Sequence, residues 1–472
     1  MSVSQSPPPK GRIAALRARY EPQIASLRGS DTAKAAGLAL AMIANNVIAL
    51  ASTVVFARLL SDYASLAALI SYFLILSVGG QALQVATARE GVLGHLGVGA
   101  GLVATLRRWM LALLVFTVVL TIASVLVRDP IAQAVGVKND QWAAAIGIPA
   151  GCLWFGLSIL RGALQAVGDY KSVGISLVGE QAVRLVSGAA LAAAGLGVTG
   201  AYLGTPISFI AMGAYCVVQM RRYVERYEAA AGPEASRPAS LEAGFGLWTH
   251  VRRAWAPIAG LAVIAVLQNI DIIAAKHRFN GTKDLASSYA ATAVAAKVLI
   301  WVAIGAGFYL VPEVSRKRAA GEDTRPVLMV ALGIVGVCAV PVLLIFAFAA
   351  RPLLHAAFGA DRLLAVNSLL ILGIAFAALA GTYLAMQYML ALKRTWFLIA
   401  IGLVAIAEPI LLLQASRKPA GFATVVLAVQ VVGALLAFGL ALRRDKRPAA
   451  PPAPWVPTAP PEQPAAPLET VA

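Results

Sequence analysis

The chain has 472 residues, is 60% hydrophobic and only 13% charged, and carries a formal net charge of +17. Apolar runs of about 20 residues, the length that a helix needs to cross a bilayer, recur along it. They exclude a soluble domain and predict an all-α, polytopic membrane protein. The basic residues form short clusters between the runs, as topogenic charge does, so no nucleic acid is expected as a partner.

The first 34 residues are predicted to form a basic cytoplasmic segment. Within it, residues 10–28 place apolar side chains at helical spacing among arginines. This segment is either an interfacial helix, kinked or broken at Pro22, or a solvated basic tail. Because it lacks an apolar signal-peptide core, the first membrane span is expected to direct insertion.

Twelve membrane spans are predicted, in two halves of six. The halves occupy residues 35–220 and 254–442, with a polar cytoplasmic linker at 221–253 between them. Residues 443–472 form a Pro- and Ala-rich cytoplasmic tail that is expected to be disordered. The spans are 36–57, 64–86, 108–127, 143–167, 173–195, 198–220, 254–275, 286–311, 326–349, 364–391, 396–415 and 421–442.

The distribution of Lys and Arg predicts the orientation of these spans. If the N-terminus is cytoplasmic, the cytoplasmic segments hold 26 of the 39 basic residues and the outer loops hold 10. Cytoplasmic loops of membrane proteins carry such an excess. Both termini are therefore expected in the cytoplasm.

The seventh span contains an acidic residue. Its segment LQNIDIIAAK (267–276) places Asp271 in the membrane just after Gln268 and Asn269. A carboxylate in hydrocarbon costs several kcal/mol unless it is paired, protonated or hydrated. At 1.5 Å per residue, Asp271 lies in the outer third of the membrane and Lys297 of the eighth span lies near mid-depth. Lys297 is thus a candidate partner, although the two depths differ.

Three further ionisable residues lie in the fourth and fifth spans. Arg184 is near mid-depth, and Glu180 lies one turn nearer the cytoplasm on the same helix face. These two are either a structural pair or part of a water-filled site. Arg161, near the inner end of its span, either snorkels to the interface or contacts a substrate.

Several amides also fall within spans and serve either as hydrogen-bond donors between helices or as cavity groups. They are Asn45, Gln81, Gln84, Gln268 and Asn269. The sequence has no metal-ligand spacing, nucleophile elbow or Walker motif, and no outer loop is long enough for a catalytic domain. We therefore expect neither an enzyme nor a cofactor, apart from a coupling ion.

Several blocks of sequence resemble bacterial polysaccharide flippases of the multidrug/oligosaccharidyl-lipid/polysaccharide exporter superfamily. They are NNVIALASTVVFARLLSDYASLAALISYFLIL (45–76), GQALQVATARE (80–90), LRGALQAVGDY (160–170), EQAVRLVSGAAL (180–191), GVTGAYLG (197–204), LQNIDIIAAKH (267–277), SSYAATAVAAKVLIW (287–301) and LVPEVS (310–315). The resemblance implies two six-helix bundles around a central cavity, lined largely by the first, second, seventh and eighth helices. The sequence departs from the family pattern at Ser61-Asp62-Tyr63-Ala64, where relatives carry a Gly-Pro-type turn. This difference is expected to change little in the protein.

The resemblance implies a transporter in the bacterial plasma membrane. By alternating access, such proteins move polyprenyl-linked saccharides to the outer leaflet for cell-envelope synthesis. The anionic headgroup is expected in a cationic cavity containing Lys297 and Arg184, with Arg161 near the cytoplasmic entrance. Asp271 would tune Lys297 or couple the cycle to H⁺ or Na⁺.

Two alternatives remain open at this stage. A cation-coupled exporter of drugs or metabolites would share the fold and use Asp271 as its cation carboxylate. A scaffold without transport activity would instead recruit glycan-synthesis proteins through the basic N-terminus and the Pro-rich tail. The deep arginine and lysine favour an anionic, lipid-linked saccharide as the partner.

Overall fold

The computed structural model describes residues 31–232, 236, 252, 255–279 and 281–443, and within these ranges every regular element is a helix. The predicted N-terminal helix and most of the predicted tail lie outside them. The N-terminal bundle contains α2 (Asp31–Leu59), α3 (Tyr63–Val92), α4 (Ala100–Leu126), α5 (Arg128–Val135), α6 (Gln141–Ala166), α7 (Tyr170–Leu191) and α8 (Gly197–Ala231).

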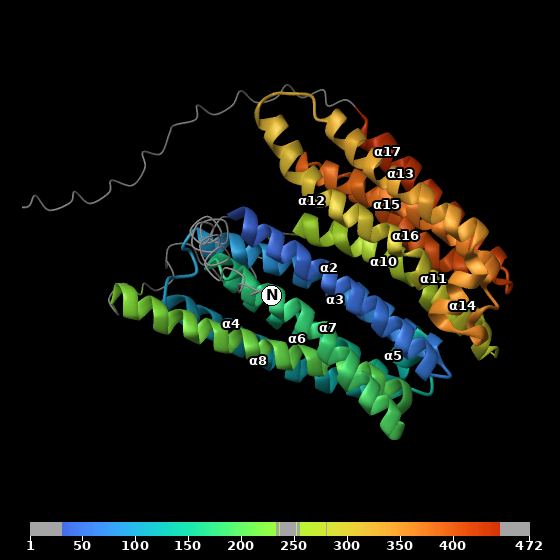
Figure 1. Ribbon diagram of the computed structural model, residues 1–472, viewed down its shortest axis with the longest axis horizontal. Coiled ribbons are helices and arrows are strands. Elements are labelled where there is room, and N and C mark those ends of the chain that lie inside the picture. The colour runs from blue at the N-terminus through green and yellow to red at the C-terminus, as the bar shows by residue number, and fades with distance from the viewer. Residues whose placement is uncertain (1–30, 233–235, 237–251, 253–254, 280, 444–472) are drawn as a thin grey trace, which may run out of the picture.

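The C-terminal bundle follows the linker. It contains α10 (Trp255–Arg278), α11 (Lys283–Ala296), α12 (Val298–Ala319), α13 (Arg325–Phe348), α14 (Ala350–Phe358), α15 (Leu369–Ala391), α16 (Phe397–Gln414) and α17 (Pro419–Ala441). The short turns η4 (Ala360–Arg362) and η5 (Val366–Ser368) join α14 to α15. Figure 1 shows the blue-to-green bundle lying beside the yellow-to-red bundle.

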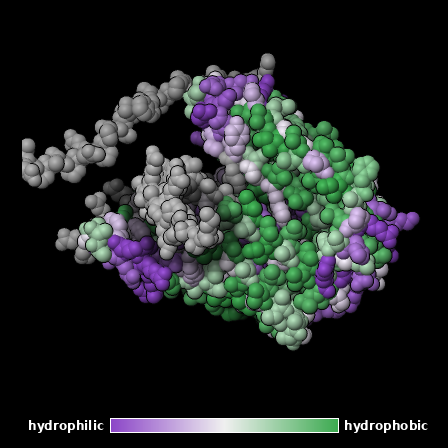
Figure 2. Space-filling view, viewed as in Figure 1, coloured by the Kyte–Doolittle hydropathy of each residue, from purple (hydrophilic) through white to green (hydrophobic). Residues whose placement is uncertain are grey.

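The prediction of a polytopic membrane protein is confirmed. In the described part of the chain, eleven stretches are long and apolar enough to cross a membrane, and one of them, Tyr170–Ala231, contains both α7 and α8. Large apolar side chains face outward; Phe348 and Val337, for example, are 86% and 76% exposed. Figure 2 shows apolar surface over the helices and hydrophilic residues at their ends, as a bilayer requires.

Helix α8 extends farther than predicted. Its 35 residues continue through RRYVERYEAAA to Ala231, within the segment expected to be linker. These residues favour helix, and the first breaker is Gly232, whose positive φ of 81° ends α8. At about 1.5 Å per residue, α8 is about 50 Å long and exceeds the hydrocarbon thickness of about 30 Å.

Small residues bring helices of one bundle into close contact. A Cβ atom at Gly162 of α6 would lie 2.4 Å from the carbonyl oxygen of Gln84 in α3. Likewise, a Cβ at Gly204 of α8 would lie 2.6 Å from the carbonyl oxygen of Arg184 in α7. Only glycine permits these approaches, which is how membrane helices gain dispersion energy without a hydrophobic driving force.

The bundles meet mainly at one end of the molecule. We call the end that holds the α2–α3 turn at residues 60–62 the turn end, and the opposite end, where α8 stops and α10 starts, the linker end. On α2, none of the residues before Ser52 whose burial is described is buried, whereas Ser52, Phe56 and Ala57, near the turn end, are. On α10, all residues from Asp271 to Ala275 are buried near the turn end, but Trp255 is 55% exposed. This gradient shows bundles packed together at the turn end and more open at the linker end.

Candidate functional site: buried charges in both bundles

A cluster of three charged residues lies inside the N-terminal bundle. Glu180 forms ion pairs through both carboxylate oxygens: Oε1 accepts a hydrogen bond from Arg184 Nη2 at 2.6 Å, and Oε2 lies 3.0 Å from Arg161 Nη2. Arg161 also donates to the hydroxyl and carbonyl oxygens of Ser176, each at 2.8 Å. One carboxylate thus bridges two guanidinium groups from neighbouring helices, and the cluster carries an excess positive charge.

The two arginines differ in access. Arg161 is completely buried, so the structure does not place it at an open entrance, and it lies too deep in the bundle to snorkel. The side chain of Arg184 is 19% exposed. Arg161 Nη1, Arg184 Nε and the hydroxyl of Tyr202 are buried without hydrogen-bond partners among the described residues. Unpaired N–H and O–H donors beside an excess of positive charge favour the binding of an anion over that of a cation.

A second cluster lies inside the C-terminal bundle. Lys297 Nζ donates to Asp271 Oδ1 at 2.9 Å, and both side chains are buried. The helix is interrupted at Lys297, which stands between α11 and α12. The ammonium also lies 5.3 Å from the ring centroid of Phe376. The candidate pairing of Asp271 with Lys297 therefore forms in the structure despite their different depths.

Two residues of this second cluster were missed in the sequence. Glu408 of α16 and Gln430 of α17 are buried, and Gln430 Nε2 donates to Glu408 Oε1 at 2.9 Å and to the Leu267 carbonyl oxygen at 3.0 Å. Glu408 Oε2 and Asp271 Oδ2 have no hydrogen-bond partner among the described residues. Glu408 could have been recognised from the sequence, because it lies inside the eleventh predicted span and ionisable groups within spans are rare.

The predicted amides do not gather at one point. Asn269 is buried and donates to the carbonyl oxygen of Ala265 at 2.9 Å, a local helix contact. Asn45 is half-buried and donates to Asn46 at 3.4 Å. Gln84 and Gln268 are half-buried, while Gln81 is exposed. Their role as cavity groups stays a prediction.

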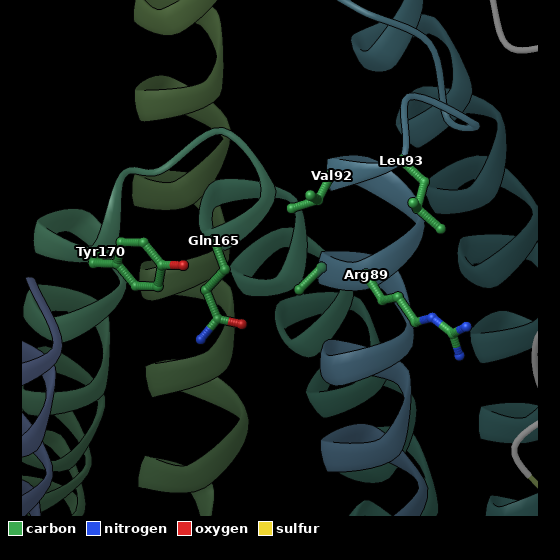
Figure 3. Close-up of a pocket in the computed structure, with 6 residues that line it drawn as sticks. Arg89, Val92, Leu93, Gln165 and Tyr170 are labelled. Carbon is green, nitrogen blue, oxygen red and sulfur yellow. The ribbon is translucent and has the colours of Figure 1, made fainter. Parts of the chain in front are cut away.

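A pocket of about 480 Å³ lies at the linker end, between the ends of α3 and α6 and the start of α7. Arg89, Gln165 and Tyr170 supply its polar groups. Figure 3 shows the side chains of Gln165 and Tyr170 close together, whereas the Arg89 guanidinium points away from both. An arginine, an amide and an aromatic ring thus line an accessible pocket at the more open end of the molecule.

No family model and no curated protein matches this sequence. Solved structures do match its fold. An inward-facing multidrug resistance MATE family transporter of the MOP superfamily has a TM-score of 0.65 and 14% identity, over 84% of this chain and 93% of that chain. Lipid II flippase MurJ in an inward closed conformation has a TM-score of 0.64 and 15% identity, over 85% and 87%.

A eukaryotic MATE transporter gives a TM-score of 0.58 and 16% identity, over 88% of this chain and 96% of that chain. All three of these structures are of transporters. Fold, length coverage and apolar helices lead to the same result: this chain is a multi-pass membrane protein with the fold of MOP superfamily transporters.

Proposed function

We propose that this protein moves a polyprenyl-linked saccharide from the inner to the outer leaflet of the bacterial plasma membrane, for cell-envelope polysaccharide synthesis. The observation that carries the proposal is the excess positive charge of the Arg161–Glu180–Arg184 cluster within a transporter fold. A phosphate or diphosphate that links lipid to saccharide is the anion that such donors suit. The polyprenyl tail would remain in the surrounding lipid.

The linker end is the proposed entrance. The excess of Lys and Arg there predicts that this end faces the cytoplasm, and the structure is more open at the same end. Because Arg161 is buried, we assign first contact with the headgroup to the pocket that contains Arg89, Gln165 and Tyr170. Guanidinium suits phosphate, while the amide and the phenol suit sugar hydroxyls.

Coupling of transport to an ion would take place in the C-terminal cluster. Asp271 and Glu408 provide two buried carboxyls against the single ammonium of Lys297, and each carboxyl has one unpaired oxygen. One bound H⁺ or Na⁺ would neutralise the remaining charge. We therefore assign the coupling role to the set of Asp271, Lys297 and Glu408.

The test is translocation of a fluorescent polyprenyl-diphosphate saccharide in proteoliposomes. Arg184→Gln should reduce the rate at least about tenfold, the loss expected from one charged hydrogen bond. This variant leaves Glu180 paired with Arg161, so the bundle retains one charge pair. Arg108→Gln, a change of the same type at an exposed site, is the matched control. Equal rates for both variants and the unmodified protein would rule out headgroup contact at Arg184.

The second candidate is a cation-coupled exporter of drugs or metabolites. The observation in its favour is the pair of carboxyls in the C-terminal cluster, Asp271 and Glu408. Under this alternative, Glu408→Gln would abolish export of cationic dyes from cells, and the protein would not move the saccharide lipid. Dye resistance without saccharide-lipid transport would replace the first candidate with the second.

A further inference from the structure

A second hollow adjoins the pocket that contains Arg89, Gln165 and Tyr170. It is an apolar groove of about 660 Å³ between the first parts of α2 and α7. Gly37 and Ala41 line this groove from α2, and Gly174, Ile175 and Val178 line it from α7. Its volume lies within the range of about 300–1,000 Å³ that is typical of small-ligand sites. We call it the α2–α7 groove.

The α2–α7 groove exists because small residues line both helices. A Cβ atom at Gly37 would meet nothing within 4 Å, so this position borders open space. A Cβ atom at Gly174 would instead lie 3.0 Å from the Cβ of Ala41, so α2 and α7 are in close contact at that point. The two helices thus close the base of the groove and leave the space above it free for a narrow, flexible chain.

The groove lies on a face of α7 that is directed toward lipid. Ile175, which lines the groove, is 46% exposed, and Val186, about three turns farther along the same face, is 69% exposed. Large apolar side chains that are exposed along a membrane span lie against hydrocarbon. Glu180 of the charged cluster, by contrast, is buried inside the bundle. An occupant of the groove would therefore come from the surrounding lipid.

The groove is continuous with the pocket to which we assign first contact with the headgroup. Tyr170, the first residue of α7, lines both. Figure 3 shows the hydroxyl of Tyr170 pointing toward Gln165, on the pocket side. One molecule can therefore extend from the pocket into the groove around the start of α7, without passing between α2 and α7. Tyrosine is also common where membrane helices leave hydrocarbon, which is the depth at which a phosphate joins its lipid chain.

The charged residues at this end suit an anion. Lys171, an exposed residue in the first turn of α7, lines the groove, and Arg89 lines the adjoining pocket. Asp169 also lines the groove, but its Oδ1 accepts the backbone N–H of Ser172 at 3.1 Å and so caps α7. Two cations against one carboxylate leave an excess positive charge at the linker end of an apolar groove. This combination fits a phosphate or diphosphate joined to a hydrocarbon chain.

We propose that the α2–α7 groove binds the isoprene units nearest the phosphate of a polyprenyl carrier while the headgroup occupies the pocket containing Arg89, Gln165 and Tyr170. The inference rests on the proposed function, because it names where that lipid substrate docks. The rest of the tail would stay in the bilayer. A chain that moves from lipid into the groove gains no hydrophobic energy, so dispersion contacts and the fit of its methyl branches decide its affinity. The groove should therefore prefer isoprenoid chains to straight acyl chains.

The test is photo-crosslinking of the full chain in nanodiscs of phosphatidylethanolamine and phosphatidylglycerol. The probe is a polyprenyl diphosphate that carries a diazirine on the isoprene unit next to the phosphate. It should attach to residues 37–41 or 171–178. Gly37→Leu fills the groove without a clash and favours helix, and it should lower the crosslinking yield at least about fivefold, as the loss of roughly ten carbon–carbon contacts would. Gly333→Leu, at an exposed glycine of α13 that also borders open space, is the matched control.

Attachment in the groove that falls in Gly37→Leu but not in Gly333→Leu supports the proposal. Attachment only at other residues overturns it, as does an unchanged yield in Gly37→Leu or an equal loss in the control. Displacement of the probe by added phosphatidylglycerol as readily as by unlabelled polyprenyl phosphate also overturns it, because the groove would then be a general lipid site. If Gly37→Leu does not fold, Ile175→Trp fills the groove from the α7 side instead.

The crosslinking result is independent of the translocation assay. Attachment in the groove without translocation of the saccharide lipid would contradict the proposed function and leave the binding site established. Translocation without attachment in the groove would contradict the binding site and leave the proposed function in place.

Discussion

Removing only one member of the buried Asp271–Lys297 pair should strongly destabilise the protein. The two side chains are 0% and 8% exposed and lie 2.9 Å apart, so Lys297→Met would leave a buried carboxylate without its cation. Breaking a buried ion pair in this way costs about 3–5 kcal/mol. An unfolding entropy of about 2 cal/mol/K per residue gives roughly 1 kcal/mol/K for a chain of this length, and hence a Tm lowered by about 3–5 °C.

The double variant separates stability from function. Lys297→Met together with Asp271→Asn removes both charges and should recover most of the Tm, because no unpaired charge remains. Thermal unfolding in detergent measures all three proteins. If the double variant melts as low as the single variant, the pairing argument is wrong. If it folds and still transports normally, neither residue carries the coupling role.

A further prediction concerns packing. Gly162→Ala should destabilise the protein by about 1–3 kcal/mol, because the new Cβ atom would lie 2.4 Å from a carbonyl oxygen of α3. Gly213→Ala is the control: its Cβ atom would meet open space, so the Tm should stay unchanged or rise.

The fold could be predicted from the sequence because membrane helices are encoded by length and hydropathy. Most ends of the predicted spans lie within a few residues of the ends of the observed helices. The extension of α8 to Ala231 was missed because a polar segment was interpreted as linker. Hydropathy marks where a helix leaves hydrocarbon, whereas Gly232 marks where it ends.

The candidate site was only partly predictable. A charge in hydrocarbon needs a partner, which identified Lys297 for Asp271 and linked Glu180 with Arg184. Arg161 turns into the bundle rather than toward an entrance, because Glu180 and Ser176 lie on the facing helix. Periodicity places a residue on a helix face but does not say which neighbour that face meets.

The contacts at the turn end were beyond sequence reasoning. Arg58 and Arg362 bond to backbone carbonyls about 300 residues away, and such acceptors leave no trace in side-chain identity. The turn Ser61-Asp62-Tyr63-Ala64 was expected to change little, yet Asp62 binds Lys276 of the other bundle. The turn therefore takes part in a contact between the two bundles that was not anticipated.

The central claim is that this protein transports an anionic lipid-linked saccharide. The most direct measurement compares two substrates in one set of proteoliposomes, a polyprenyl-diphosphate saccharide and a cationic dye. The excess positive charge beside Arg184 predicts translocation of the saccharide lipid, a marked loss of this activity in Arg184→Gln, and no dye transport. Dye transport without saccharide-lipid translocation would contradict the account.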